Sequence, residues 1–230
     1  MFSLSEDWNP LQLRLKEIIM KKEHFGEMQL LLLQLHSIVH SKTVYNNMNS
    51  SFLDEIWEDL SDIAFRTMPT TTDDTIAWHI WHITRIEDLT ANFLMAEREQ
   101  VLTQEWLDKL KITVQDTGNA MSDSEIMDLS NRIDKATLYE YRKSVGQRTK
   151  EIINNLKPED MKRKVARKDL DRIAEAGGVT SHPSSNWLLD FWGRKNIAGI
   201  IQMPITRHQV VHLNDCKRLK RVCVRKAVKE

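Results

Sequence analysis

Hydrophobic positions recur every three or four residues over most of the chain, which is the period of an amphipathic α-helix. Residues 11–41 are rich in the strong helix formers Leu, Lys, Glu and Gln, with Gly26 as a candidate break. A shorter amphipathic helix is expected over residues 52–65. The polar run TTTDD at 70–74 predicts the start of a long helix that reaches about Glu97.

In the second half of the chain, capping boxes, prolines and glycines predict where helices begin and end. No internal repeat, low-complexity tract or long linker divides the sequence. One all-α domain spanning residues 1–230 is therefore the simplest account. Two helices are expected to start near 123 and 138, at the boxes Ser122–Glu125 and Thr137–Glu140. A third is expected to start at Pro158 and to end at Gly177-Gly178. The last helical region is expected to run from about Trp187 to Val224, with a candidate interruption at 193–196.

Composition supports a helical, water-soluble fold. Glycine and proline together account for 12 of 230 residues, about half of ordinary usage, which argues against turn-rich sandwiches, barrels and propellers. The longest uncharged stretch, Met28–Ser41, is shorter than the roughly 20 apolar residues that span a membrane. The N-terminal residues have neither the basic nor the apolar region of a signal peptide. We therefore expect a cytoplasmic protein with no membrane partner.

Charge is balanced overall but unevenly distributed. Residues 51–100 carry eleven acids and three bases, whereas residues 201–230 carry eight bases and two acids. A basic end can indicate nucleic-acid binding, but no nucleic-acid motif or interleaved aromatic residue accompanies these bases. We interpret them as the solvated cations of a final helix, whose dipole they complement, and expect no nucleic-acid partner.

The two cysteines, Cys216 and Cys223, lie seven residues apart in a segment that is expected to be helical. On one helix they would be about 10 Å apart, which is too far for a disulfide. Their spacing is not that of a CxxC redox or zinc motif. We expect two free, buried thiols.

Candidate chemistry rests on paired histidines. In the last helix, His208 and His212 are one turn apart on the midline of the predicted apolar face. A buried polar ring without a partner costs about 1–3 kcal/mol, so both rings need partners. The i,i+4 spacing also brings two imidazoles to one side of a helix, where a single metal ion can satisfy both.

The predicted helix at 74–97 carries a second pair, His79 and His82, in its own apolar stripe. Arg85, Asp88 and Asn92 are expected to point away from this stripe. One of the two histidines together with the pair in the last helix would give three ligands and an open position, as in reactive metal sites. Ordinary hydrogen-bonded core histidines are the alternative, and spacing alone does not choose between them or between His79 and His82.

Several familiar chemistries lack their motifs in this sequence. The HQVVH segment at 208–212 lacks the glutamate of the HExxH metalloproteases, and no ExxH di-iron motif occurs. Neither a glycine-rich nucleotide loop nor a GxSxG serine elbow is present. His36 and His40 also have i,i+4 spacing, but we interpret them as packing or surface residues.

Two segments resemble DinB-like proteins. Residues 75–88 (TIAWHIWHITRIED) resemble the second bundle helix of that family, in which a Trp-rich segment ends in a histidine followed by an apolar residue. Residues 203–212 (MPITRHQVVH) resemble its last core helix with the HxxxH pattern. The region 98–180 matches only in its helical character. The resemblance implies an up-down-down-up four-helix bundle, here with additional short helices, which holds a divalent metal through three histidines.

Carried over residue by residue, the implied ligands are His82, His208 and His212. His82 is preferred to His79 because it occupies the Trp-His-Ile position of the family pattern. The resemblance favours zinc or nickel, and iron also accepts imidazole ligands. Asp215, near the histidine stripe, is a candidate to orient a ligand. The candidates for a pocket or for outer contacts to the ligands are His79, Trp78 and Trp81.

The family includes thiol-dependent S-transferases and isomerases that use low-molecular-weight thiols. The resemblance thus implies a metal-dependent S-transferase that forms homodimers, with a small-molecule thiol and an electrophile as substrates. A metal with three neutral ligands lowers the pKa of a bound water as well as of a bound thiol, so a hydrolase would use the same ligands. A non-catalytic, dimeric metal-binding protein of the stress-response type and a nucleic-acid binder are two further hypotheses. The sequence identifies no catalytic residue beyond the ligands.

Overall fold

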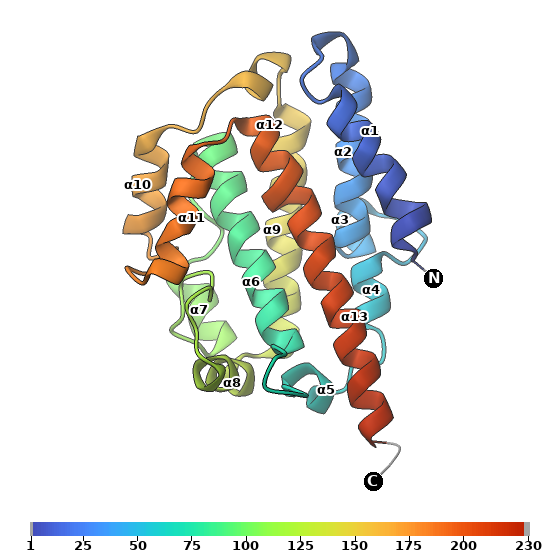
Figure 1. Cartoon of the computed structure of the whole chain (residues 1–230), viewed down its shortest axis with the longest axis vertical. Helices are drawn as coiled ribbons and strands as arrows, with labels where there is room; N and C mark the ends of the chain where they lie inside the picture. The colour runs from blue at the N-terminus through green and yellow to red at the C-terminus, as the bar shows by residue number, and fades with distance from the viewer. Residues whose placement is uncertain (1, 228–230) are drawn as a thin grey trace.

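In the computed structural model, which describes residues 2–227, four long helical segments form a bundle (Figure 1). In the view of Figure 1, α2 and α13 run downward, whereas α6 and α9 run upward. This arrangement is the up-down-down-up topology, and the prediction of an all-α bundle with additional short helices is confirmed. The bundle helices are α2 (Phe25–Val39), α6 (Ile76–Leu89), α9 (Lys135–Asn155) and α13 (His208–Ala227), the last continuing a rod formed by α12 (Ile197–Ile200) and the π-helical segment Ile201–Arg207.

Shorter helices cover the ends and sides of this bundle. Because α6 and α9 run in the same direction, the chain needs a long crossover between them, and α7 and α8 lie in it. Residues 164 and 196 form an isolated β-bridge, and no strand occurs among residues 2–227. The shorter helices are α1 (Asn9–Ile18), α3 (Lys42–Tyr45), α4 (Phe52–Trp57), α5 (Asp62–Arg66), α7 (Gln104–Leu110), α8 (Asp123–Arg132), α10 (Arg167–Glu175) and α11 (Pro183–Gly193), with helical turns at Leu4–Trp8, Lys22–His24, Thr90–Met95 and Pro158–Lys162.

Helix starts follow the side chains that cap them. The capping box at Ser122 and Glu125 is formed in full and starts α8 as predicted. The expected start near 138 is wrong, because the side chain of Asp134 accepts a hydrogen bond from the Thr137 amide and starts α9 at Lys135. The single helix expected over 52–65 is divided into α4 and α5, since Asp59 has a left-handed φ of 54° and Ser61 caps a new helix.

The helix expected to run from Pro158 to Gly177 is likewise divided. Pro158 opens only a short 3-10 turn, and α10 begins at Arg167. Between them the chain is extended, and the amide of Val165 donates a hydrogen bond to the carbonyl of Lys195. This backbone pairing with the segment before α12 replaces the hydrogen bonds of a continuous helix.

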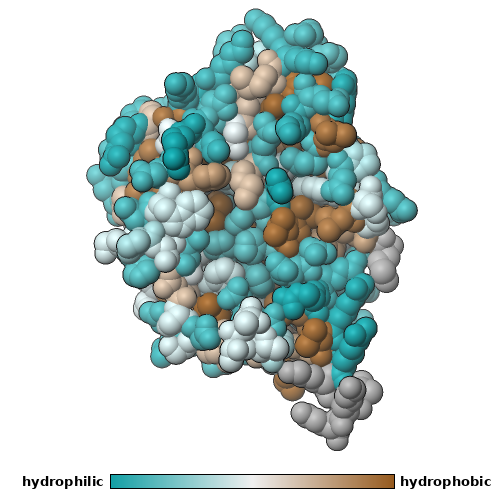
Figure 2. All heavy atoms as spheres, viewed as in Figure 1, coloured by the Kyte–Doolittle hydropathy of each residue, from teal (hydrophilic) through white to brown (hydrophobic). Residues whose placement is uncertain are grey.

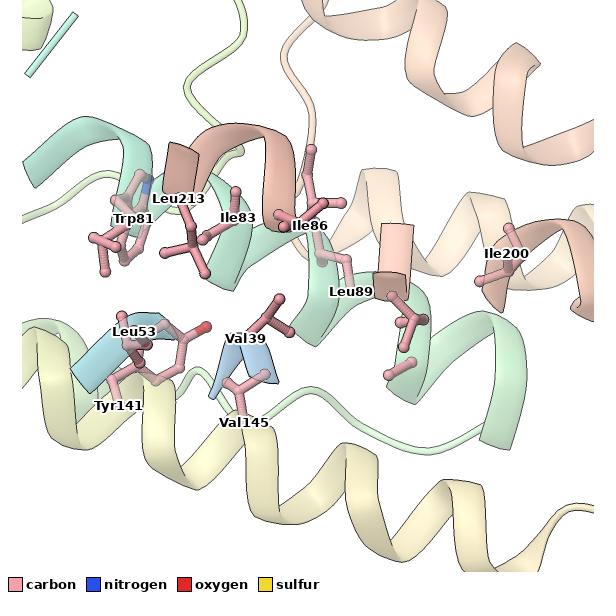
Figure 3. Packing of buried hydrophobic residues seen from close by; sticks show 14 of the residues in the cluster. Val39, Leu53, Trp81, Ile83, Ile86, Leu89, Tyr141, Val145, Ile200 and Leu213 are labelled. Carbon is pink, nitrogen blue, oxygen red and sulfur yellow. The ribbon is translucent and has the colours of Figure 1, made fainter. Parts of the chain in front are cut away.

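Helix α6 lies at the centre of the molecule, and all of its residues are buried. Figure 3 shows apolar side chains of α6, among them Ile83 and Ile86, in one buried cluster with Leu213 of α13, Val39 of α2 and Val145 of α9. Arg85, Asp88 and Asn92, which were expected to point away from the apolar stripe of this helix, are nevertheless all fully buried. The crossover covers that face of α6: Asp88 pairs with Arg85 at 3.0 Å and accepts hydrogen bonds from the amides of residues 101 and 102.

The basic C-terminal helix lies against the acidic segment near α4. Lys217 Nζ is 3.7 Å from a Glu55 carboxylate oxygen, and Arg218 pairs with Asp73 at 2.8 Å. Lys220 Nζ donates to backbone carbonyls of α4, including that of Ile56 at 3.0 Å. The two blocks of opposite charge in the sequence therefore face each other within the fold.

Cys216 and Cys223 are free and buried, as expected. Among the described residues, no helix combines the length and the apolar character that crossing a membrane requires. The face of the molecule in Figure 2 is largely hydrophilic, with small apolar patches between polar side chains.

Candidate metal centre

Helices α6 and α13 bring four histidines together. Nε2 of His82 lies 3.2 Å from Nε2 of His208, and the ring centroid of His212 lies 4.7 Å from that of His82 and 4.5 Å from that of His208. The ligand nitrogens of these three residues all lie within 4.8 Å of one another. His79 contacts the group from the side of His212, with 2.8 Å between their Nδ1 atoms.

Local sequence fixes where each helix begins and therefore which residues face each other. The Thr75 hydroxyl accepts a hydrogen bond from the Trp78 amide, which starts α6 at a residue that turns His79 and His82 towards α13. On the other side, a π-helical segment containing Pro204 precedes His208. Proline has no amide hydrogen, so a wider helical turn fits here, and regular α-helix resumes at His208.

One carbonyl sets the protonation state of His82. Its Nδ1 lies 2.7 Å from the carbonyl oxygen of Thr117, which can only accept a hydrogen bond. Nδ1 must therefore carry the proton when the ring is neutral, and the lone pair of Nε2 points towards His208. Hydrogen bonds of this kind orient histidine ligands in metal sites.

The Thr117 carbonyl belongs to a short non-helical segment of the crossover, residues 115–118, which we call the 115–118 strap. Four consecutive carbonyls of the strap accept hydrogen bonds from side chains of α6, so the strap fixes one face of that helix. The pairs are Gln115 with Arg85 Nε, Asp116 with Trp81 Nε1, Thr117 with His82 Nδ1 and Gly118 with Trp78 Nε1.

Gly118 allows the strap to approach Trp78. Its φ of 76° is left-handed, and a β-carbon at this position would lie 2.7 Å from Trp78 Nε1. The indole of Trp78 in turn stacks on the ring of His82, with 4.6 Å between centroids and an interplanar angle of 10°. Trp78 therefore forms a wall of the histidine cluster, whereas Trp81 is fully buried near Tyr141 and Arg85.

Burial keeps these imidazoles neutral. It lowers the pKa of His82 to about 4 and that of His79 to about 3, and it lowers the pKa values of His208 and His212 well below the ordinary range. Neighbouring histidines add to the effect on all but His82. Metal ligation requires the neutral form of histidine. These four residues are therefore in the state that a metal needs at neutral pH.

The spacing of the nitrogens also fits a metal. Two imidazole nitrogens bound to one tetrahedral zinc at about 2.0–2.1 Å are separated by roughly 3.3–3.4 Å. The 3.2 Å between the Nε2 atoms of His82 and His208 is close to that value. His79 and His82 are almost completely buried, but His208 and His212 are partly exposed, so the α13 side of the cluster is accessible to solvent.

A second arrangement shares one of these residues. His79, His212 and Asp215 also place ligand atoms within 4.8 Å of one another. His212 thus belongs to two overlapping groups, and Asp215 lies beside the cluster as its sequence position suggested. The geometry admits either His82 with His208 or His79 with Asp215 as the companions of His212.

Comparison with known families identifies the fold that carries this cluster. The family model described as the DinB superfamily matches residues 51–214, which include α6, α9 and the part of α13 that bears both histidines. The chain belongs to the DinB superfamily. A comparison with curated proteins finds no match.

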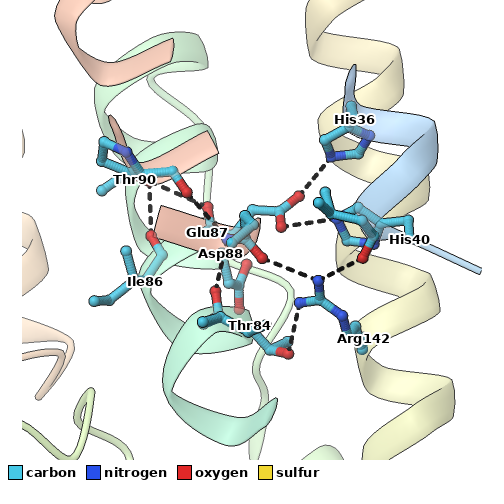
Figure 4. Close-up of polar contacts among 12 residues, drawn as sticks. His36, His40, Thr84, Ile86, Glu87, Asp88, Thr90 and Arg142 are labelled. Carbon is cyan, nitrogen blue, oxygen red and sulfur yellow. Dashed lines mark hydrogen bonds and ion pairs between the residues drawn. The ribbon is translucent and has the colours of Figure 1, made fainter. Parts of the chain in front are cut away.

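This DinB-superfamily chain contains a further group of possible metal ligands, two of which lie before the matched region. His36 and His40 of α2 each place Nε2 2.8 Å from a different oxygen of Glu87 on α6 (Figure 4). All three side chains are fully buried, and their ligand atoms also lie within 4.8 Å of one another. The nearby Arg142 guanidinium supplies a positive charge. Both oxygens of Glu87 have donors and its charge is compensated, so we interpret this group as a hydrogen-bonded core network.

The sequence did not indicate the partners of these histidines. His36 and His40 were interpreted as packing or surface residues, and their complete burial excludes the surface alternative. That interpretation did not include Glu87, which lies 51 and 47 positions away and carries no motif. The 115–118 strap acts through backbone carbonyls, which any residue supplies. Within the strap, only the glycine at position 118 could have indicated a special backbone conformation, because glycine favours the left-handed φ that it has here.

Proposed function

We propose that this DinB-superfamily protein binds one divalent transition metal through His82, His208 and His212. The observation that supports this most directly is the lone pair of His82 Nε2, fixed by the Thr117 carbonyl and directed at His208 Nε2 over 3.2 Å. Zinc or nickel suits three neutral imidazoles, and iron is also compatible. His79, hydrogen-bonded to His212, would orient that ligand rather than bind the metal.

We further propose a metal-dependent thiol S-transferase activity. When bound, the cation would supply Lewis acidity at its open position, where it lowers the pKa of a thiol or a water. The chain's own contribution is the neutral ligand set, the aromatic wall formed by Trp78 and the partly exposed α13 side of the cluster. The resemblance to thiol-dependent family members favours the thiol, and a hydrolase remains the alternative because it needs the same ligands.

Two further roles and the oligomeric state are also to be tested by experiment. A non-catalytic metal-binding bundle of the stress-response type would have the same ligands but no response to thiols or electrophiles. Homodimer formation, which the family resemblance suggests, is a further prediction that light scattering in solution can test. Nucleic-acid binding by the C-terminal helix is less favoured, because Lys217, Arg218 and Lys220 are engaged by α4 and Asp73.

The ligand assignment is tested by metal content in single variants of the untagged protein. His82→Ala, His208→Ala and His212→Ala should each lose stoichiometric metal in elemental mass spectrometry while the helical circular dichroism is largely retained. His79→Ala should keep its metal, as should the control His24→Ala, whose ring lies beside Glu27 at the start of α2. If His79→Ala loses metal and His82→Ala retains it, the group containing Asp215 is the correct one.

The activity is tested separately with metal-loaded protein and a panel of low-molecular-weight thiols. One thiol should raise the melting temperature of the metal-loaded protein and leave that of the metal-free protein unchanged. No response to any thiol, together with stoichiometric metal, would contradict the S-transferase and favour the non-catalytic or hydrolytic alternative.

A further inference from the structure

A buried glutamine joins the two helices that carry the candidate ligands. Gln209 follows His208 on α13 and is fully buried. Its side-chain amide donates to the carbonyl of Ile83 at 3.1 Å and to that of Pro204 at 3.0 Å. Ile83 directly follows His82 on α6. The hydrogen bond between α13 and α6 therefore lies one residue beyond a ligand on each helix.

The orientation of this amide is fixed by a buried arginine. Nη2 of Arg142, on α9, donates to Gln209 Oε1 at 2.9 Å and to the carbonyl of Val39 on α2 at 2.8 Å. Since a guanidinium can only donate, the oxygen of Gln209 must face it and the amide nitrogen must face Ile83. Gln209 thus has partners for its oxygen and for both amide hydrogens.

Arg142 is itself held in the core by a compensating charge. It is fully buried, and Glu87 is the carboxylate that attracts it. Glu87 is fixed by His36 and His40 from α2, as Figure 4 shows. Arg142 itself joins the four bundle helices, because from α9 it donates to the Thr84 hydroxyl on α6, to the Val39 carbonyl on α2 and to Gln209, the residue beside His208 on α13. Hydrogen bonds in the low-dielectric core are stronger than in water, so these bonds together favour one arrangement of the four helices.

We propose that Gln209 is a positioning residue for the metal centre, which holds His208 on α13 at the correct distance from His82 on α6, with Arg142 fixing the orientation of its amide. This inference rests on the proposed metal site. It adds residues that bind neither metal nor substrate and that the family resemblance did not suggest.

The test compares Gln209→Met with Gln29→Met. Methionine has a similar length to glutamine but cannot form the hydrogen bonds. Gln29 is a matched control, because its amide also donates to two main-chain carbonyls, those of Ile153 and Asn154, at the C-terminal end of α9. Cobalt(II) is the probe, since its visible absorption reports the geometry of the ligands and a titration gives the affinity.

Gln209→Met should bind cobalt about 10- to 100-fold more weakly than the wild-type protein, a loss of the size seen when groups that position a ligand are removed, and should show an altered visible spectrum. Gln29→Met should bind with wild-type affinity and spectrum. Both variants are measured at a temperature at which circular dichroism shows them folded, because a purely structural loss of stability would not change the spectrum of the folded protein.

Gln209→Glu provides a second variant in case Gln209→Met does not fold. Glutamate keeps the acceptor for Arg142 but cannot donate to Ile83, so it should also weaken cobalt binding and change the spectrum. A wild-type spectrum and affinity in whichever Gln209 variant folds would overturn the inference. A wild-type protein that binds no cobalt at all would instead overturn the proposed metal site, and with it this inference.

Discussion

Two pairs of histidines in this protein have the same spacing but different surroundings. His208 and His212 face other imidazoles on a partly exposed side of the bundle, whereas His36 and His40 face one carboxylate in the fully buried core. The carboxylate accepts a hydrogen bond from each ring and removes the need for an ion. The partner across the helix interface, not the i,i+4 spacing, therefore determines which pair suits a metal.

The buried pair predicts how stability depends on pH. Burial lowers the pKa of His40 to about 3, whereas an unfolded histidine titrates near its ordinary value of about 6.5. Below pH 6.5 the unfolded state therefore takes up a proton that the folded state does not, and stability falls as the pH falls. Between pH 7.5 and 5.0, His40 alone should remove about 2 kcal/mol from the free energy of unfolding.

The measurement is urea unfolding of metal-free protein at both pH values, for the wild type and for His40→Gln. Glutamine can still donate a hydrogen bond to Glu87 but does not titrate, so the pH dependence of the variant should be weaker by about 2 kcal/mol. Equal pH dependence in the two proteins would show that His40 does not stay neutral in the fold.

At the level of single residues, the candidate ligands were predictable and their partners were not. The spacing of His208 and His212 and the Trp-His-Ile segment around His82 are local patterns in the sequence. The Thr117 carbonyl, 35 residues from His82, and Glu87, 51 residues from His36, meet their histidines only through the tertiary fold. Whether His79 or His82 completes the site cannot be read from spacing, because both face α13.

At the scale of elements, the 115–118 strap is the part of the crossover that matters most for the site. Its four carbonyls hold α6 side chains from Trp78 to Arg85 and set the tautomer of His82. Helix ends were predictable where one box of residues governs them, as at Ser122. The start of α9 was not predictable, because Asp134 caps this helix three residues before the expected cap at Thr137.

The substitution Gly118→Ala tests the strap. The left-handed φ of 76° and the 2.7 Å approach to Trp78 Nε1 should together destabilise the protein by about 1–3 kcal/mol. Because the strap also holds His82, metal affinity should fall in the same variant. Urea unfolding of the metal-free protein and a zinc competition titration measure the two effects.

The control for this substitution is Gly26→Ala in α2. No atom lies within 4 Å of the position that its β-carbon would occupy, so alanine should be neutral or stabilise by up to about 1 kcal/mol through its helix propensity. Metal affinity should not change. If Gly118→Ala binds zinc as tightly as Gly26→Ala does, the strap has no role in preparing His82.

At the scale of the whole molecule, the bundle could be predicted because low glycine and proline content, helical periodicity and the family resemblance agree. The burial of α6 on every side could not be predicted, since an amphipathic pattern indicates one buried face and the crossover covers the other. The burial of Arg85, Asp88 and Asn92 was missed for that reason. The contact between the acidic residues 51–100 and the basic residues 201–230 likewise could not be predicted, because it forms only when α13 packs against α4.

The central claim is that helices far apart in the sequence bring His82, His208 and His212 to one metal ion. A crystal structure of the zinc-loaded protein, with anomalous diffraction at the zinc edge, tests it most directly. The account predicts one strong anomalous peak about 2.0–2.1 Å from a ring nitrogen of each of these three residues. A peak among His79, His212 and Asp215, a peak at Glu87, or no ordered zinc in the bundle would contradict it.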